Sequence, residues 1–91
     1  MEKKGNIEID NIIVNPEENF VCISVNPRLY KMHVIMNAAD EFITEAEFMI
    51  SGDPEKEITI KFIPKKKLTK EELIRLAYRF STQLVSHSAT R

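Results

Sequence analysis

The chain has 91 residues, enough for one small domain and too few for two, so we expect a single domain spanning 1–91. Thirteen Lys and Arg against fourteen Asp and Glu give a formal net charge of -1, which excludes a strong overall attraction to nucleic acid or to an anionic membrane. Apolar residues make up 43% of the chain without forming a continuous run of about 18, which predicts a globular protein without a membrane-spanning helix.

Both ends are polar, and we expect residues 1–5 and 86–91 to fray. The start of the chain lacks the apolar segment of a signal peptide. Its single cysteine, Cys22, has no partner for an internal disulfide, which fits a reducing compartment. We therefore expect a cytoplasmic protein.

Residues 6–14 predict a short strand with an irregular end, because Ile7 and Ile9 alternate with polar residues and 12–14 are continuously apolar. The segment 15–19, which contains Pro16 between asparagine and glutamates, interrupts the strand. Phe20 to Val25 alternates again and predicts a second strand. The two strands could form a hairpin.

A helix is predicted from Pro27 to Ile43. Asn26 can accept a hydrogen bond at its start, and proline at the first helical position sacrifices no bond. Apolar residues recur along the segment with helical spacing, which predicts that one face of the helix packs on the sheet. This predicted stripe consists of Met32, Ile35, Met36, Ala39 and Phe42.

Two alternating runs, Ala46 to Ile50 and Ile58 to Phe62, flank a polar turn and predict a second hairpin. Thr69 and Glu72 have the spacing of a capping box and predict the start of the last helix. We expect Phe42 and Phe80 to be core residues. Phe80 belongs to the apolar stripe of this second helix, which consists of Leu73, Leu76, Ala77, Phe80 and Leu84.

These elements predict an α+β fold: a small two-layer domain of order β-β-α-β-β-α, with two helices on one face of a mostly antiparallel sheet. If the last strand inserts between its predecessors, the topology is a truncated ferredoxin-like split β-α-β without its final strand. A simple meander is the alternative. Both leave sheet edges and one sheet face uncovered, where a partner or a second copy could bind.

No residues have the spacing of a catalytic, metal or cofactor site, so we predict a protein that is not an enzyme and binds no metal or cofactor. His33, His87 and Cys22 are the candidate metal ligands, but they fall on a helix, a tail and a strand and match no zinc motif. We expect His33 on a solvated helix face. Cys22 has no base nearby in sequence, so we interpret it as a buried or half-buried strand residue.

The strongest local charge feature is a cluster of lysines at the end of the last predicted strand and just after it, Lys61 and Lys65–Lys67. Arg75, Tyr78 and Arg79 follow this cluster on the last helix. Such a cluster could neutralise phosphates, but the negative net charge favours a solvated strand end. Weak nucleic-acid binding through Lys61 and Lys65–Lys67 stays open as an alternative. The predicted partner-binding residues, which include outward-facing positions of the last strand, are Thr59, Lys61, Lys65, Lys66 and Lys67.

Several short motifs between residues 20 and 91 resemble the His-Xaa-Ser system protein HxsD family. They are a Leu-Tyr-Lys-Met start of the first helix, an Ala-Ala-x-x-Phe end, the second hairpin, and a Phe-x-x-x-Leu-Val segment in the last helix. The sequence departs from the family at Asp40, where an aromatic residue is usual, and at 81–83. The matching positions are Tyr30, Ala38, Ala39, Phe42, Phe80, Leu84, Val85 and Arg91.

This resemblance implies a small non-catalytic accessory or adaptor protein encoded beside radical S-adenosylmethionine (radical SAM) enzymes. Those enzymes modify a peptide that contains His-Xaa-Ser repeats. The implied function is to bind the radical SAM enzyme or its substrate peptide, with catalysis in the partner. A self-associating structural module that forms homo-oligomers is the other class that the uncovered sheet leaves open.

Overall fold

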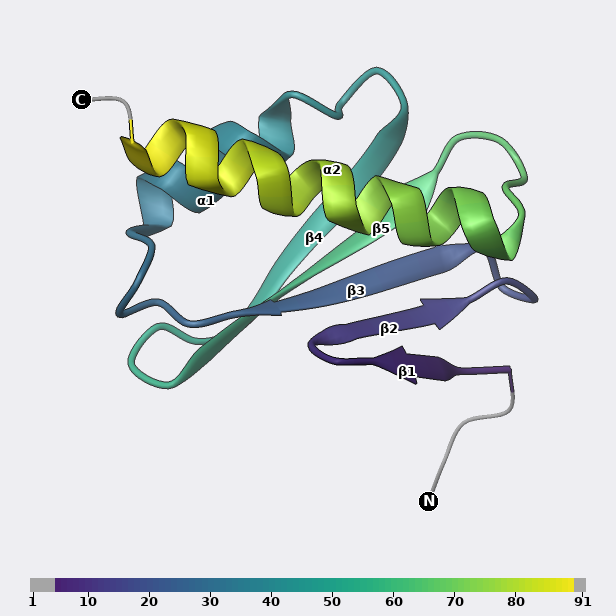
Figure 1. Cartoon of the computed structure of the whole chain (residues 1–91), viewed down its shortest axis with the longest axis horizontal. Coiled ribbons are helices and arrows are strands. Elements are labelled where there is room, and N and C mark those ends of the chain that lie inside the picture. Colours follow the sequence, from purple (N-terminus) through teal and green to yellow (C-terminus); the bar gives the residue numbers. More distant parts are fainter. Residues whose placement is uncertain (1–4, 90–91) are drawn as a thin grey trace.

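The computed structural model describes residues 5–89 and shows one sheet covered by two helices, in the order β-β-β-α-β-β-α (Figure 1). This confirms the predicted α+β class, with one strand more than expected. The elements are β1 (Ile7–Ile9), β2 (Ile12–Asn15), β3 (Phe20–Val25), α1 (Met32–Asp40), β4 (Ala46–Asp53), β5 (Glu57–Pro64) and α2 (Lys70–Ala89).

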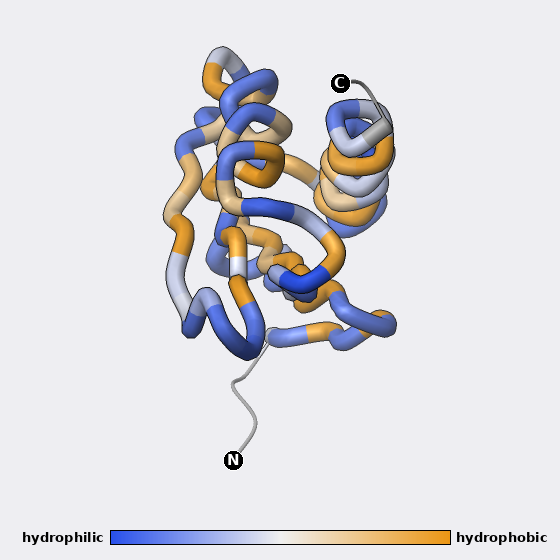
Figure 2. Tube along the Cα trace, turned by 90° about the vertical axis from the view of Figure 1, so that its left-hand side faces the viewer, coloured by the Kyte–Doolittle hydropathy of each residue, from blue (hydrophilic) through white to orange (hydrophobic). Residues whose placement is uncertain are grey.

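The strands lie in the order β1-β2-β3-β5-β4, and all neighbours are antiparallel. The last strand therefore inserts between β3 and β4, as in the split β-α-β version of the two predicted topologies. Both helices lie on the same side of the sheet (Figure 2). This arrangement leaves β1 and β4 as the two edge strands.

The first predicted strand is wrong, because residues 6–14 form two strands rather than one. Asp10 adopts a positive φ of 53°, which asparagine and aspartate tolerate better than most residues, and the chain reverses there. Asn11 then fixes the hairpin against β3. Its side-chain amide donates to the Ser24 carbonyl at 2.8 Å, and the Ser24 N–H donates to the Asn11 carbonyl at 2.9 Å.

The first helix begins later than predicted, at Met32 instead of Pro27. Asn26 does accept a backbone hydrogen bond, from the N–H of Arg28 at 2.9 Å, but it organises an isolated turn. Lys31 is extended, with φ -70° and ψ 155°, and so separates this turn from α1. The helix ends at Asp40, followed by tighter i to i−3 bonds, such as that from the Phe42 N–H to the Ala39 carbonyl.

The prediction that Met32 and Met36 belong to the buried stripe is also wrong. The residues of α1 that point into the core are Ile35, Ala38 and Ala39, and Phe42 follows them in the next turn. Both methionines lie beside this face, at the helix surface. Since α1 is short and buries only Ile35, Ala38 and Ala39, its buried face is narrower than the apolar stripe in the sequence.

The capping box at the start of α2 is confirmed. The Thr69 N–H donates to Glu72 Oε1 at 2.9 Å, and the Glu72 N–H donates to Thr69 Oγ1 at 3.1 Å. The first of these bonds lowers the pKa of the Glu72 carboxyl. Residues 86–89, which we expected to fray, belong to α2. Of the other terminal positions of that prediction, Gly5 is described and has a positive φ of 87°, whereas 1–4 and 90–91, including Arg91, lie outside the described residues.

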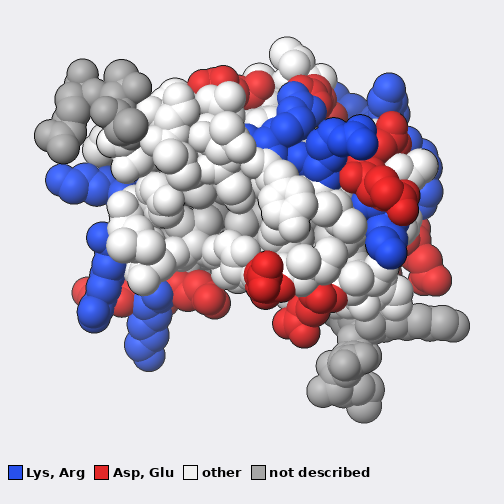
Figure 3. All heavy atoms as spheres, in the orientation of Figure 1, with Lys and Arg blue, Asp and Glu red and all other residues white. Residues whose placement is uncertain are grey.

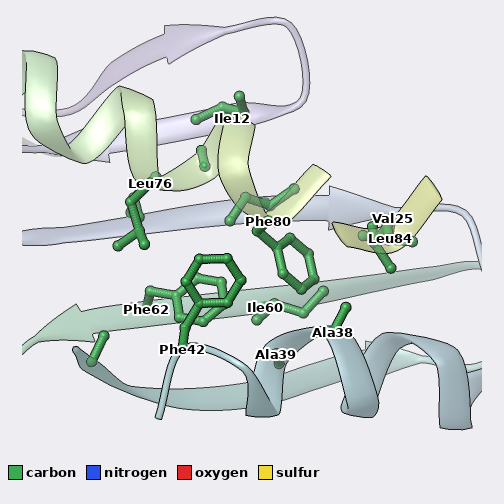
Figure 4. Close-up of a cluster of buried hydrophobic side chains, with 14 of the residues drawn as sticks. Ile12, Val25, Ala38, Ala39, Phe42, Ile60, Phe62, Leu76, Phe80 and Leu84 are labelled. Atoms are coloured by element: carbon green, nitrogen blue, oxygen red, sulfur yellow. The ribbon is translucent and has the colours of Figure 1, made fainter. Parts of the chain in front are cut away.

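The core contains a cluster of phenylalanines between the helices and the sheet (Figure 4). Phe62 of β5 lies at its centre, with its ring centroid 5.2 Å from that of Phe80 and 5.6 Å from that of Phe42. All three rings are buried, and each pair meets edge to face. This confirms the prediction that Phe42 and Phe80 are core residues. The predicted stripe of α2 is buried as well.

Candidate protein-binding surface

Thr59 and Lys61, the predicted contact residues on a strand, lie on β5 in the middle of the sheet. Both are half-buried on the face opposite the helices, where Thr59 is flanked by Ser24 of β3 and Ser51 of β4. The Lys61 amine lies over the Phe20 ring, 4.3 Å from its centroid. These two residues therefore belong to the uncovered sheet face and lie away from both edges.

Lys65, Lys66 and Lys67 are exposed in the segment that follows β5, and each also holds neighbouring loops in place. The Lys65 N–H donates to the Glu45 carbonyl at 2.9 Å, and the Lys66 carbonyl accepts from Asn19 Nδ2 at 3.0 Å. The Lys67 amine donates to carbonyls of the turn between β2 and β3. Of these bonds, those of Lys67 use the lysine side chain and those of Lys65 and Lys66 use the backbone, so a structural function accounts for one lysine of the cluster.

Acidic side chains lie among the basic ones near the start of α2, so the cationic surface is interrupted (Figure 3). Arg79 donates to both carboxylate oxygens of Glu45, at 2.9 and 2.7 Å. This bidentate contact lowers the pKa of Glu45 and raises that of Arg79. Glu72 adds a further negative charge beside Lys66 and Arg75. The arrangement weakens the case for a phosphate-binding surface.

The three candidate metal ligands do not come together. His33 is exposed on α1, as predicted, whereas His87 lies in α2 and contacts the Glu41 carboxylate after α1. Cys22 is half-buried in β3, which confirms its interpretation as a strand residue. Among the described residues, no three or more His, Cys, Asp or Glu side chains form a group suited to a metal ion.

Two shallow grooves lie beside the second half of α2. One, of about 570 Å³, separates the start of α1 from the end of α2 and is lined by Tyr30, His33 and His87 among others. The second, of about 440 Å³, runs between α2 and the end of β3, with Leu29 and Val85 at its rim. The surface over this half of α2 is uncharged (Figure 3).

The longest unpaired edge of the sheet belongs to β4. This strand has eight residues and, within the described chain, pairs only with β5, whereas the opposite edge strand β1 has three residues. An exposed edge strand carries a row of backbone N–H and C=O groups that can accept another strand. The edge of β4 is therefore the stronger candidate for strand addition.

The register shows which groups of β4 face outward. Ala46 is opposite Pro64, which has no N–H, and the Lys65 N–H donates to the carbonyl of Glu45. Because hydrogen-bonded and non-hydrogen-bonded pairs alternate in an antiparallel ladder, the even-numbered residues of β4 point their backbone groups away from β5. The Ala46 N–H is already bonded to the Phe42 carbonyl. The outward N–H groups are those of Phe48, Ile50 and Gly52.

Exposed apolar side chains lie on β4 and on the segments that precede it in the chain. Met49 is 60% exposed on the uncovered face of β4, and Ile43 is 52% exposed in the loop that precedes the strand. Met36 of α1 is 50% exposed and lies about 140° around the helix axis from Glu41, which contacts α2. Since Glu41 contacts α2, Met36 lies on the side of α1 away from α2, which packs over β2 and β3. We call Met32, Met36, Ile43, Met49 and the outer edge of β4 the β4-edge surface.

Sequence reasoning did not identify the β4-edge surface, although it anticipated an exposed sheet edge. The one sequence signal was the group of methionines at 32, 36 and 49, since methionine suits adaptable binding surfaces. Two of these residues were assigned to the core instead. Strand order, which a single sequence does not give, was needed to place Met49 on an edge.

A scan against protein-family models and searches of the curated proteins and of the solved structures found no match to this chain. The resemblance to the HxsD family therefore stays a prediction. Across the residues that the structure describes, neither helix is long and apolar enough to cross a membrane.

Proposed function

We propose that this protein is a non-catalytic adaptor that binds an extended segment of a partner protein by adding it as a sixth strand to the outer edge of β4. The observation that carries the proposal is the combination of outward backbone groups along β4 with exposed Met36, Ile43 and Met49 beside them. Strand addition obtains affinity from main-chain hydrogen bonds and specificity from alternate side chains. The β4-edge surface offers both.

The resemblance to the HxsD family suggests the partner. It points to a radical SAM enzyme that modifies a peptide, or to that enzyme's substrate peptide, with the adaptor bringing the two together. In this proposal the partner supplies all of the chemistry. The adaptor contributes a rigid sheet edge, held in place by the phenylalanine core below α2 and by the pairing of β4 with β5.

Self-association and nucleic-acid binding are the competing functions. A second copy could pair through the same edge, and a nucleic acid could contact the lysines after β5. The acidic residues among those lysines, and the bonds of the Lys67 amine to the carbonyls of Pro16 and Glu17, give less support to nucleic acid. Sedimentation over a concentration series detects self-association, and binding to mixed oligonucleotides at several salt concentrations detects the nucleic-acid function.

Met49→Lys should weaken the complex with the radical SAM enzyme or its peptide by about tenfold or more, because it replaces an apolar contact with a solvated charge at the centre of the binding edge. Val85→Lys is the matched control, since Val85 is 57% exposed on α2, away from β4. Co-purification at low salt detects the complex, and titration of the pure components measures the affinity of each variant. Equal loss in the two variants, or no complex with either component, contradicts the proposal.

A further inference from the structure

Negative charge is concentrated in the part of the sequence that contains β4. Half of the fourteen acidic residues lie between positions 40 and 57, and Lys56 is the single basic residue in that stretch of sequence. Two of them already have partners in α2, because Glu45 contacts Arg79 and Glu41 contacts His87. The acidic residues of this stretch are Asp40, Glu41, Glu45, Glu47, Asp53, Glu55 and Glu57.

The two faces of β4 differ in chemistry. On the helix-covered face the strand presents Ala46, Phe48, Ile50 and Gly52, because Phe48 and Ile50 are the register partners of the buried Phe62 and Ile60. On the uncovered face it presents Glu47, Met49, Ser51 and Asp53. A strand added to β4 would therefore have apolar neighbours on one face and mainly acidic or polar neighbours on the other.

We infer that the segment bound at β4 is cationic and amphipathic, with apolar residues alternating with lysine or arginine. This inference rests on the proposed function and specifies its partner. The apolar side chains would pack beside Phe48 and Ile50, and the basic ones would lie beside Glu47 and Asp53 on the uncovered face. A second copy of this chain fits less well, because it would bring two equally acidic edges together.

The test uses three synthetic peptides of about eight residues, which matches the length of β4. They alternate valine with lysine, with serine or with glutamate. We expect the lysine peptide to bind about tenfold or more tightly than the serine peptide at low salt, and the glutamate peptide to bind weakest. Amide chemical shifts of the intact protein report both the affinity and the place of binding. The preference should shrink as the salt concentration rises.

The outcomes separate this inference from the proposed function. If all three peptides bind at β4 with equal affinity, the edge accepts strands without a charge preference, and only the cationic inference fails. If none binds, or if the shifts occur away from β4, strand addition itself is wrong. A peptide with the same composition but with its lysines and valines in separate blocks should bind at least about fivefold more weakly. Equal binding of that peptide overturns the alternating pattern.

Glu47→Lys provides the reciprocal test on the protein. Glu47 is exposed on the uncovered face, so the substitution should leave the fold unchanged. We expect the lysine peptide to bind about fivefold more weakly to this variant and the glutamate peptide to bind more tightly. Glu8→Lys, on the exposed β1 at the opposite edge, makes the same change in net charge. An equal effect of both variants would show that net charge, rather than the β4 edge, determines the preference.

Discussion

Phe80→Ala is expected to lower the free energy of unfolding by about 3–5 kcal/mol. The Phe80 ring is fully buried and packs edge to face against Phe62 and Phe42, with ring centroids 5.2 and 6.3 Å away. Removing it leaves a cavity between α2 and the sheet and breaks both aromatic contacts. For a domain of this size the melting temperature should fall by about 12 °C or more.

The control for this variant is Tyr78→Ala, two residues earlier on the same helix. Tyr78 is 51% exposed, so its truncation should change the free energy of unfolding by no more than about 0.5–1 kcal/mol. Urea unfolding followed by circular dichroism measures both variants. If Phe80→Ala were as stable as the Tyr78 variant, α2 would not form the core of this domain.

Gly52→Ala should destabilise the protein by at least about 2 kcal/mol. Gly52 lies in β4 at φ +111°, a conformation that residues with a side chain rarely adopt. An added Cβ would lie 2.3 Å from the Glu57 carbonyl oxygen, and this atom belongs to the backbone of the partner strand. The end of the β4–β5 hairpin would have to move to accommodate it.

Ser51→Ala is the matched control for Gly52→Ala, because Ser51 is exposed at the adjacent position of the same strand. Ser51→Ala should change the free energy of unfolding by no more than about 0.5 kcal/mol. Thermal unfolding of the two variants side by side measures the difference. Equal stability would mean that the backbone at position 52 can relax to an ordinary strand conformation.

The parts of the fold that depend on local pattern could be predicted from the sequence. Helical spacing identified the buried face of α2 from Leu73 to Leu84, and the reciprocal side-chain bonds of Thr69 and Glu72 follow from a four-residue motif. Alternation identified β4 and β5, although both strands run longer than the alternating apolar residues, to Asp53 and Pro64.

The errors arose where a local signal was compatible with two structures. Asn26 and Pro27 can begin a helix or form a turn, and the extended conformation of Lys31 is what separates the turn from α1. Met32 and Met36 recur with the same helical spacing as the buried residues of α1, so the sequence pattern alone places them on the buried face. In the structure Ile35, Ala38 and Ala39 face the core, which leaves the two methionines at the helix surface.

The candidate site depends on contacts that are distant in sequence. The outer edge of β4 is exposed because β5 inserts between β3 and β4. The alternation of apolar residues in the two strands does not predict this order. The same insertion places Thr59 and Lys61 in the middle of the sheet, where they face outward on its uncovered face. The acidic character of residues 40–57 was visible in the sequence, but it indicates a partner only once β4, which lies within this stretch, is found at an exposed edge.

Hydrogen exchange of the β4 amides, with and without the alternating lysine–valine peptide, tests the account most directly. The Phe48 and Ile50 N–H groups point outward, whereas those of Glu47 and Met49 point toward β5. We predict that the first pair exchanges quickly in the free protein and becomes protected in the complex, while the second pair is protected in both states. If the peptide binds and protects amides elsewhere while Phe48 and Ile50 still exchange quickly, the β4 edge is not the binding site.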